Sequence, residues 1–297
     1  MIGAVADAAT RVRRLPRAEF PELLRQIHDP PRVLYLRGAG DLELLARPAV
    51  AIVGARACSP YGSQVARMLG RELAAAGLVV VSGLARGVDG EAHRGVLEAE
   101  GVTVAVLGCG IDRDYPAAHA HLARRICEQG LVVSEYEPGV EPAPWRFPAR
   151  NRIIAGLAAA TVIVEARERS GALITADFAL EDGREVFAVP GEITGSLAAG
   201  TNRLLRQGAT PLTSSADVLE MFGLGLVPAA QPQPLGPNAS RVRDRLAESS
   251  ATADELAHAT GLDAGPLAAA LAELELAGLV SEADGRYRGV RPPHLGS

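Results

Sequence analysis

The sequence contains no lysine, and all 30 of its basic side chains are arginine. The absence of lysine excludes Schiff-base chemistry on a lysine side chain, and it removes the phosphate-binding lysine of most P-loop NTPases. We attribute the preference for arginine over lysine mainly to GC-rich coding, since the alanine and glycine contents are high as well. Arginine nevertheless retains full ability to bind phosphate, since its planar guanidinium donates two parallel hydrogen bonds.

Cysteines are few, and long apolar runs are missing. Cys58, Cys109 and Cys127 are not spaced as pairs and lie far from any histidine cluster, which argues against disulfides and against zinc. No apolar run is long enough to cross a bilayer, and the N-terminus lacks the apolar core of a signal peptide. We therefore expect a cytoplasmic chain without membrane insertion and without a metal.

The net charge of −5 argues mildly against a nucleic-acid partner. If nucleic acid is the partner, binding must come from a local basic patch.

One stretch, residues 49–93, organises the rest of the chain. Ala49–Val53 is an unbroken apolar run, as expected for a strand that is buried on both faces. The spacing of apolar residues predicts a helix over 63–76, and a second buried strand follows at 78–81. So short a crossover implies parallel strands. Both strands end in small or polar residues, which allows a bound anion to approach the main chain.

Further strands and helices alternate along the chain as far as residue 222. We expect strands at 102–107, 131–134, 161–165, 185–189 and 210–213, and Asp89 is expected to cap the helix after the second buried strand. This alternation predicts one α/β domain over residues 45–222, with a doubly wound, mainly parallel, Rossmann-like sheet. Residues 1–44 form an N-terminal extension, in which we expect a short helix at 21–27 and a strand at 32–36.

Ligands of open parallel sheets bind at the carboxyl ends of the strands. Arginine, glycine, serine and asparagine follow these strands, and any single glycine is more often explained by a turn than by a ligand. The prediction of a phosphate-binding edge therefore depends on several such residues converging. The candidates are Gly54, Arg56, Ser82, Gly83, Arg86, Arg113, Arg150, Asn151, Ser170, Gly171 and Asn202.

A linker rich in proline and glycine, residues 223–238, precedes a small C-terminal domain at 239–291. Three expected helices and a hairpin with an Asp284-Gly285 turn indicate a winged helix. The second helix opens on a capping box formed by Thr252 and Glu255. The third helix, 267–276, exposes only alanine and glutamate, whereas base recognition requires arginine, lysine, asparagine or glutamine. We therefore favour a protein-interaction role for this domain.

Common nucleotide cofactors fit the sequence poorly. The first loop lacks the GxGxxG pattern, and the second strand ends in Ser82-Gly83, where a ribose-binding acid is expected. A Walker A motif is also missing. We expect no cofactor and no catalytic residues.

Eight blocks of the sequence, in order, resemble the DprA/Smf family of DNA-processing proteins. They are VGARACSPYG, SGLARGVDGEAH, VAVLGCGIDRDYP, SEYEPG, FPARNRIIAGL, VIVEARERSGALITA, GREVFAVPG and GTNRLLRQGA, and they cover about residues 20–220. The resemblance implies a dimeric protein that binds single-stranded DNA, protects incoming strands during natural transformation and loads the RecA recombinase. The C-terminal winged helix resembles the appendage of many members.

The resemblance also assigns roles to particular residues. It implies that Arg56 is the principal phosphate contact, and that Gly83, Arg86, Asn151, Ser170 and Gly171 line the pocket. Family members usually carry a lysine just after the Tyr-Pro dipeptide, where this chain has alanine, and Arg113 is our candidate replacement. The family's N-terminal helical domain is missing or vestigial here.

The alternative interpretation is an enzyme that resembles nucleotide phosphoribohydrolases. Those enzymes carry a PGGxGTxxE pattern, whereas the corresponding loop here is SGALITADF. Neither the double glycine nor the glutamate is in register, so a general acid or base is missing. Glu165 and Asp177 are nearby and are interpreted as structural carboxylates.

Overall fold

The computed structural model describes residues 11–225, 235–277, 279–283 and 285–289. The chain divides into two compact units, Met1–Val227 and Pro228–Ser297, each with its own hydrophobic core. Among the described residues, no helix combines the length and the apolarity that a bilayer crossing requires.

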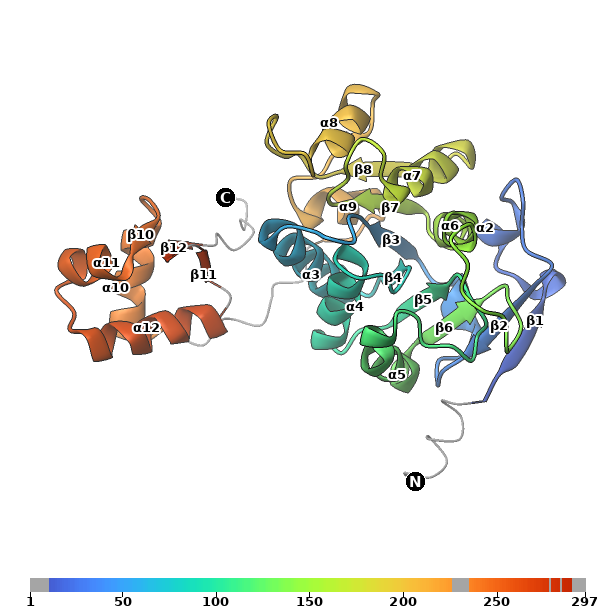
Figure 1. Cartoon of the computed structure of the whole chain (residues 1–297), viewed down its shortest axis with the longest axis horizontal. Coiled ribbons are helices and arrows are strands. Elements are labelled where there is room, and N and C mark those ends of the chain that lie inside the picture. The colour runs from blue at the N-terminus through green and yellow to red at the C-terminus, as the bar shows by residue number, and fades with distance from the viewer. Residues whose placement is uncertain (1–10, 226–234, 278, 284, 290–297) are drawn as a thin grey trace. The chain divides into compact units, whose positions relative to one another are not determined.

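The first unit is built on a nine-stranded, mostly parallel sheet (Figure 1). From one edge to the other, its strands are β1 (Arg13–Pro16), β2 (Val33–Arg37), β6 (Leu131–Ser134), β5 (Thr103–Leu107), β4 (Val79–Ser82), β3 (Ala49–Val53), β7 (Ala160–Ile163), β8 (Glu185–Ala188) and β9 (Thr210–Pro211). The seven strands from β6 to β9 in this order run parallel, and β1 and β2 are antiparallel additions at one edge. The expected strand at 32–36 is confirmed as β2, and the short strand β1 is an addition to the expected elements. β1 and β2, from the N-terminal extension, join the same sheet as the strands of residues 45–222.

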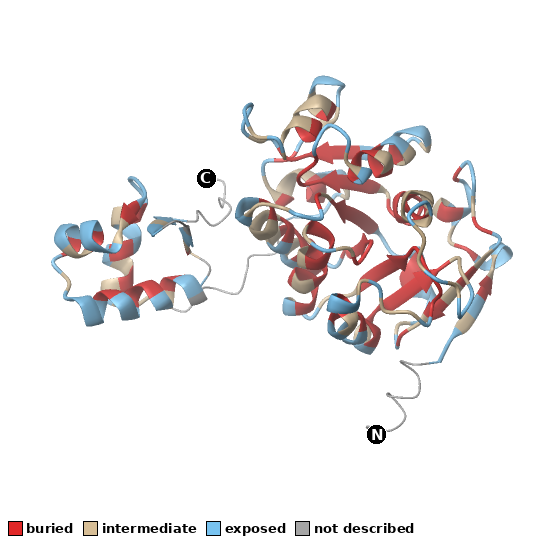
Figure 2. Ribbon diagram, in the orientation of Figure 1, coloured by how far each residue is buried: buried red, intermediate tan, exposed pale blue. Residues whose placement is uncertain are grey.

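Helices cover both faces of this sheet, so the expected doubly wound fold is confirmed (Figure 2). One face packs against α3 (Pro60–Ala75), α4 (Val88–Glu98), α5 (Ala120–Gln129) and α9 (Ser215–Met221). The other face packs against α2 (Glu22–Arg25), α6 (Arg146–Gly156), α7 (Gly171–Glu181) and α8 (Ala199–Arg206). Short 3-10 turns, η1 (Arg17–Glu19), η2 (Leu42–Ala46) and η3 (Ala117–His119), complete the connections.

The strand order reverses direction at β3. From β3 the chain builds outward through β4, β5 and β6, then returns to place β7 on the other side of β3. Every residue of β3 and β7 is buried. The loops that leave neighbouring strands at such a reversal diverge to opposite faces of the sheet and open a crevice between them. The crevice is therefore expected at the carboxyl ends of β3 and β7.

The second unit is a winged helix, as predicted. It contains α10 (Pro237–Leu246), α11 (Ala253–Thr260), α12 (Ala264–Leu276) and a three-stranded sheet of β10 (Ala251–Thr252), β12 (Arg286–Gly289) and β11 (Val280–Ala283). The capping box at the start of α11 is confirmed, with Thr252 and Glu255 bonded reciprocally. Residue 284 of the expected Asp284-Gly285 turn, most of the linker (226–234) and residues 290–291 lie outside the described residues.

Candidate nucleic-acid interface

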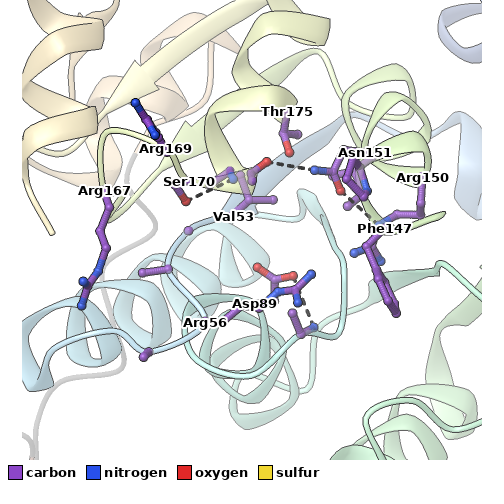
Figure 3. A pocket seen from close by; sticks show the side chains of 18 residues that line it. Val53, Arg56, Asp89, Phe147, Arg150, Asn151, Arg167, Arg169, Ser170 and Thr175 are labelled. Atoms are coloured by element: carbon purple, nitrogen blue, oxygen red, sulfur yellow. Dashed lines mark hydrogen bonds between the residues drawn. The ribbon is translucent and has the colours of Figure 1, made fainter. Parts of the chain in front are cut away.

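A cavity of about 300 Å³ opens at the carboxyl ends of β3 and β7 (Figure 3). The loop after β3, the first turns of α6 and α7, and the loop between β7 and α7 form its walls. It is lined by Val53, Gly54, Ala55, Arg56, Ala57, Ala85, Asp89, Phe147, Pro148, Arg150, Asn151, Ile154, Arg167, Arg169, Ser170, Gly171, Ala172 and Thr175. Six of the eleven candidate residues thus lie around one cavity, at the position that the sheet topology favours for a ligand.

Three arginines at the rim of the cavity have exposed side chains. Arg56 comes from the loop after β3, while Arg167 and Arg169 come from the loop after β7. Within the described part of the chain, none of the three has an ion-pair partner or a side-chain hydrogen bond within the protein. The Arg56 guanidinium lies 5.3 Å from the centre of the Phe147 ring, and a cation–π interaction with this ring stabilises its position. The rim therefore presents unneutralised positive charge to a ligand.

The floor of the cavity contains a buried acid and a buried arginine. Asp89 accepts hydrogen bonds from the backbone N–H groups of Gly83 (3.1 Å) and Ala85 (3.3 Å). The Arg150 guanidinium donates to the Gly83 carbonyl at 2.8 Å and to the Val106 carbonyl. These contacts fix the loop after β4. Asp89 therefore organises this loop instead of capping α4, whose N-cap is Gly87.

Burial shifts the pKa of both charged groups on the floor. Burial lowers the pKa of the Arg150 guanidinium to about 10; the Asp89 carboxylate opposes this shift, and the nearby charge of Arg56 adds to it. Burial has the opposite effect on an acid, so it raises the pKa of the Asp89 carboxyl, and the positive charge of Arg150 counteracts part of this rise. Arg150 remains protonated at neutral pH, so its charge contributes to the positive potential of the cavity.

Gly83 fits between these two side chains because it lacks a Cβ atom. A Cβ atom there would lie 2.6 Å from Nη2 of Arg150 and 2.7 Å from Oδ2 of Asp89. Both distances are shorter than van der Waals contact, so a larger residue would displace the floor of the cavity.

Asn151 joins two walls of the cavity. Its Nδ2 donates to the Gly171 carbonyl at 3.0 Å, and its Oδ1 accepts from Nε of Arg150 at 3.2 Å. Ser170 is the N-cap of α7 and accepts from the backbone N–H of Ala172 at 3.3 Å. The N-terminus of α7 therefore faces the cavity and adds a partial positive charge (Figure 3).

The structure places the remaining candidates elsewhere. Ser82 is fully buried, where its hydroxyl donates to the Ile52 carbonyl at 2.6 Å and links β4 to β3. Asn202 bonds both backbone groups of Gly191. Arg113 forms an ion pair with Glu141 (2.7 Å). Gly83 and Arg86 lie on the loop after β4. Gly83 lies beneath the cavity, and Arg86 is exposed and forms no side-chain hydrogen bond or ion pair with the described residues.

Glu165 has a structural role, in agreement with its interpretation from the sequence. Its two carboxylate oxygens accept from the hydroxyl and the backbone N–H of Ser59, at the N-terminus of α3. This carboxylate therefore already neutralises the dipole of α3. The N-terminus of α3 is therefore not available to an external anion.

Twelve of the eighteen lining residues are not among the candidates from the sequence, and four of these twelve carry a charge or an aromatic ring: Asp89, Phe147, Arg167 and Arg169. The two arginines follow the buried strand 160–163, and the rule that selected Arg56 after β3 applies equally to them. Phe147 was missed because no strand precedes it directly, whereas α6 begins at Arg146 and brings it to the cavity.

Comparison with known proteins identifies the family of the chain. The sequence model for DNA recombination-mediator protein A matches residues 12–223, and the model for the DprA winged helix domain matches residues 227–286. The chain belongs to the DprA/Smf family. The family resemblance read from the eight sequence blocks is thus confirmed.

Individual relatives cover most of this chain. The DNA processing protein DprA of Streptococcus pneumoniae is 46% identical over 68% of this chain and 71% of its own length. Protein Smf of Escherichia coli is 38% identical over 92% of this chain and 75% of its own length. A structure of DNA processing protein A from Helicobacter pylori, described for its unique single-stranded DNA binding mode, has a TM-score of 0.65 at 33% identity. That match covers 72% of this chain and 97% of that chain.

Proposed function

We propose that the chain binds single-stranded DNA through backbone phosphates at the cavity between β3 and β7. In this proposal it is a cytoplasmic homodimer that protects incoming strands and loads the RecA recombinase on them during natural transformation. The family membership and the binding mode reported for the Helicobacter pylori relative support the DNA part of this proposal. The protection and recombinase roles come from the family resemblance.

The observation that carries the proposal is the arginine rim. Arg56, Arg167 and Arg169 converge on one cavity, exposed and without acidic partners among the described residues, in a chain whose net charge is −5. Two other arginines of the same unit are ion-paired, Arg67 with Glu98 and Arg113 with Glu141, whereas the three rim arginines form no ion pair with any residue that the structure describes. Guanidinium groups without internal partners keep their donors for an external anion, and phosphate is the anion that they fit best.

The enzyme alternative has one observation in its favour. Asp89 is a cavity-lining carboxyl whose pKa is raised by burial, as is common for general acids. However, its Oδ2 already accepts two backbone N–H groups. These bonds give Asp89 a structural role, so we propose that the cavity binds a strand and does not hydrolyse nucleotides.

Two assays on the purified chain separate these functions. Fluorescence anisotropy with labelled single-stranded and double-stranded DNA of one length should show tighter binding of the single strand. Incubation with nucleoside monophosphates should release no free base above the buffer control. Base release that is abolished by Asp89→Asn would support the enzyme instead.

The dimer is tested independently of DNA. Met221 and Leu224, at the end of the first unit, are 41% and 37% exposed, and apolar side chains of this kind suit a self-association surface. Light scattering at a concentration on the order of 10 µM should report twice the mass of the chain. A monomer mass at that concentration would rule out a dimer of useful affinity.

A further inference from the structure

The most exposed aromatic ring of the described chain lies beside the cavity, not inside it. Trp145 is 63% exposed and is the N-cap residue of α6, immediately before Arg146 and Phe147. Phe147 lines the cavity and stacks on Tyr115, with 5.3 Å between the ring centres. Because consecutive Cα atoms are about 3.8 Å apart, the Cα atom of Trp145 is within roughly 8 Å of that of Phe147.

Arg146 holds this indole beside a second aromatic ring. Its guanidinium carbon lies 4.9 Å from the ring centre of Trp145 and 4.9 Å from that of Tyr136. The same guanidinium donates to the Glu141 carbonyl, which anchors it to the loop before α6. The indole is therefore positioned by a cation–π contact and by its place on a helix, although most of its surface remains in water.

We propose that Trp145 is a stacking platform for an unpaired nucleobase of the strand whose phosphate occupies the cavity. This inference rests on the proposed function and adds a base-binding subsite to it. An exposed aromatic face beside a group of arginines is the arrangement with which proteins bind single strands, because every base offers a π-face whatever its sequence. In a duplex the bases are stacked and paired inside the helix, so they cannot lie on the indole.

The platform also explains how the site distinguishes single from double strands. Phosphate contacts at Arg56, Arg167 and Arg169 are available to either form of DNA and carry no information about pairing. A base on Trp145 is available only from an unpaired strand. The preference for single strands therefore depends on the indole more than on the arginines.

Tryptophan fluorescence tests this assignment directly, since Trp145 is the only tryptophan in the chain. Three labelled probes of about 30 residues are titrated into the full chain: oligothymidylate, an abasic strand with the same phosphates, and a duplex. Anisotropy measures binding, and indole emission reports stacking. We expect oligothymidylate to quench the emission at saturation, and the abasic strand and the duplex to leave it nearly unchanged.

Two variants separate stacking from general apolar contact. Trp145→Phe retains an aromatic face and should stay within about threefold of wild type, whereas Trp145→Leu retains bulk only and should weaken oligothymidylate binding by about tenfold. Binding of the abasic strand should be the same in wild type and both variants.

Some outcomes would overturn the platform but leave the proposed function intact. They are tight binding of oligothymidylate without any change in indole emission, or equal affinity of wild type and Trp145→Leu. If no probe binds wild type at all, the proposed function itself fails.

Discussion

The arginines of the cavity differ in what their side chains already contact. Arg150 is buried and donates to two backbone carbonyls, so turning it toward a phosphate would leave those carbonyls unpaired at a cost of about 1–3 kcal/mol each. Arg56, Arg167 and Arg169 are exposed and break no hydrogen bond or ion pair of the described residues when they bind an anion. Arg150 therefore shapes the site and adds long-range charge, and the rim arginines make the phosphate contacts.

This division predicts opposite results for two arginine variants. Arg169→Ala removes a rim donor and should weaken single-strand binding by about tenfold, since a hydrogen bond to a charged group contributes about 1.5 kcal/mol or more. Arg113→Ala removes a side chain that is paired with Glu141 and does not line the cavity, so affinity should change little. Anisotropy titrations at one salt concentration provide the comparison. An equal loss for Arg113→Ala would support the hypothesis that Arg113 replaces the family's usual lysine.

His93 predicts how stability depends on pH. Its Nδ1 lies 2.8 Å from the Thr103 hydroxyl oxygen, and its Nε2 is buried without a partner. Burial lowers the pKa of His93 from 6.5 to about 3, with the charges of His119, Arg150 and Arg94 adding to the shift. Between these two values the unfolded chain binds a proton that the folded chain does not, so the contribution of His93 to stability falls as the pH drops from 6.5 towards 3.

Urea unfolding at neutral pH and at about pH 4.5 measures this contribution. His93→Asn retains an N–H donor for Thr103 but does not titrate, so the variant should lose less stability than wild type between the two pH values. If wild type and His93→Asn lose equal stability, His93 is not the source of the acid sensitivity.

At the scale of elements, glycines allow α3 and α4 to pack backbone against backbone. A Cβ atom on Gly95 of α4 would lie 2.0 Å from the Arg67 carbonyl oxygen of α3, and one on Gly70 of α3 would lie 2.3 Å from the Ala92 carbonyl oxygen of α4. The atoms in the way are backbone and cannot rotate aside. α4 begins just after the loop that contains Gly83, so this packing also positions the floor of the cavity.

Gly95→Ala should therefore destabilise the first unit by about 1–3 kcal/mol, because overpacking forces the two helices apart. Gly265→Ala on α12 is the matched control, since a Cβ atom there meets open space and alanine favours a helix. Chemical unfolding of both variants gives the comparison. A neutral Gly95→Ala would show that α3 and α4 can separate without cost.

The sequence predicted the central strands to within two residues, because strands buried on both faces are continuous apolar runs. It missed β1, since Arg13–Pro16 is an edge strand with arginine and proline and has no apolar pattern. The proline-rich sequence before Arg150 has no helical pattern, yet α6 begins at Arg146, because Pro148 lies in its first turn, where proline is tolerated. This early start puts Phe147 on the cavity and Arg150 inside the helix.

The contacts of single side chains were harder to predict than the elements. Ser82 ends β4 and Asn202 lies in α8, and both side chains bond to backbone groups of the protein. Packing between elements decides which polar side chains bond within the protein and which remain available to a ligand. The spacing of residues along the sequence does not reveal that packing.

At the scale of the whole molecule, the two units have separate hydrophobic cores. Helix α12 exposes alanines and Glu275, and Arg243 on α10 is bonded to Asp244. Deleting Pro228–Ser297 should therefore leave single-strand affinity within about threefold, because the winged helix contributes few unpaired cations. A collapse of affinity, with the first unit still folded by circular dichroism, would place part of the DNA site on the second unit.

The net charge of −5 makes electrostatic binding to DNA a local property of this protein. Far from the surface a strand is weakly repelled, and close to the rim it meets Arg56, Arg167 and Arg169. Added salt screens the repulsion and also weakens the counterion release that drives phosphate binding. The slope of log affinity against log salt concentration therefore measures how many phosphates the rim neutralises.

The salt slope of Arg56→Ala tests the phosphate-binding cavity most directly. Affinity for a labelled single strand is measured across a series of salt concentrations for wild type, for Arg56→Ala and for Arg124→Ala, an exposed arginine on α5 that serves as the control. Losing one phosphate contact should weaken binding by about ten- to a hundredfold and flatten the log–log salt slope by about 0.7. Arg124→Ala should change neither value. If Arg56→Ala folds normally and binds as tightly as wild type with an unchanged slope, the cavity is not a phosphate site, and the account given for this protein is wrong.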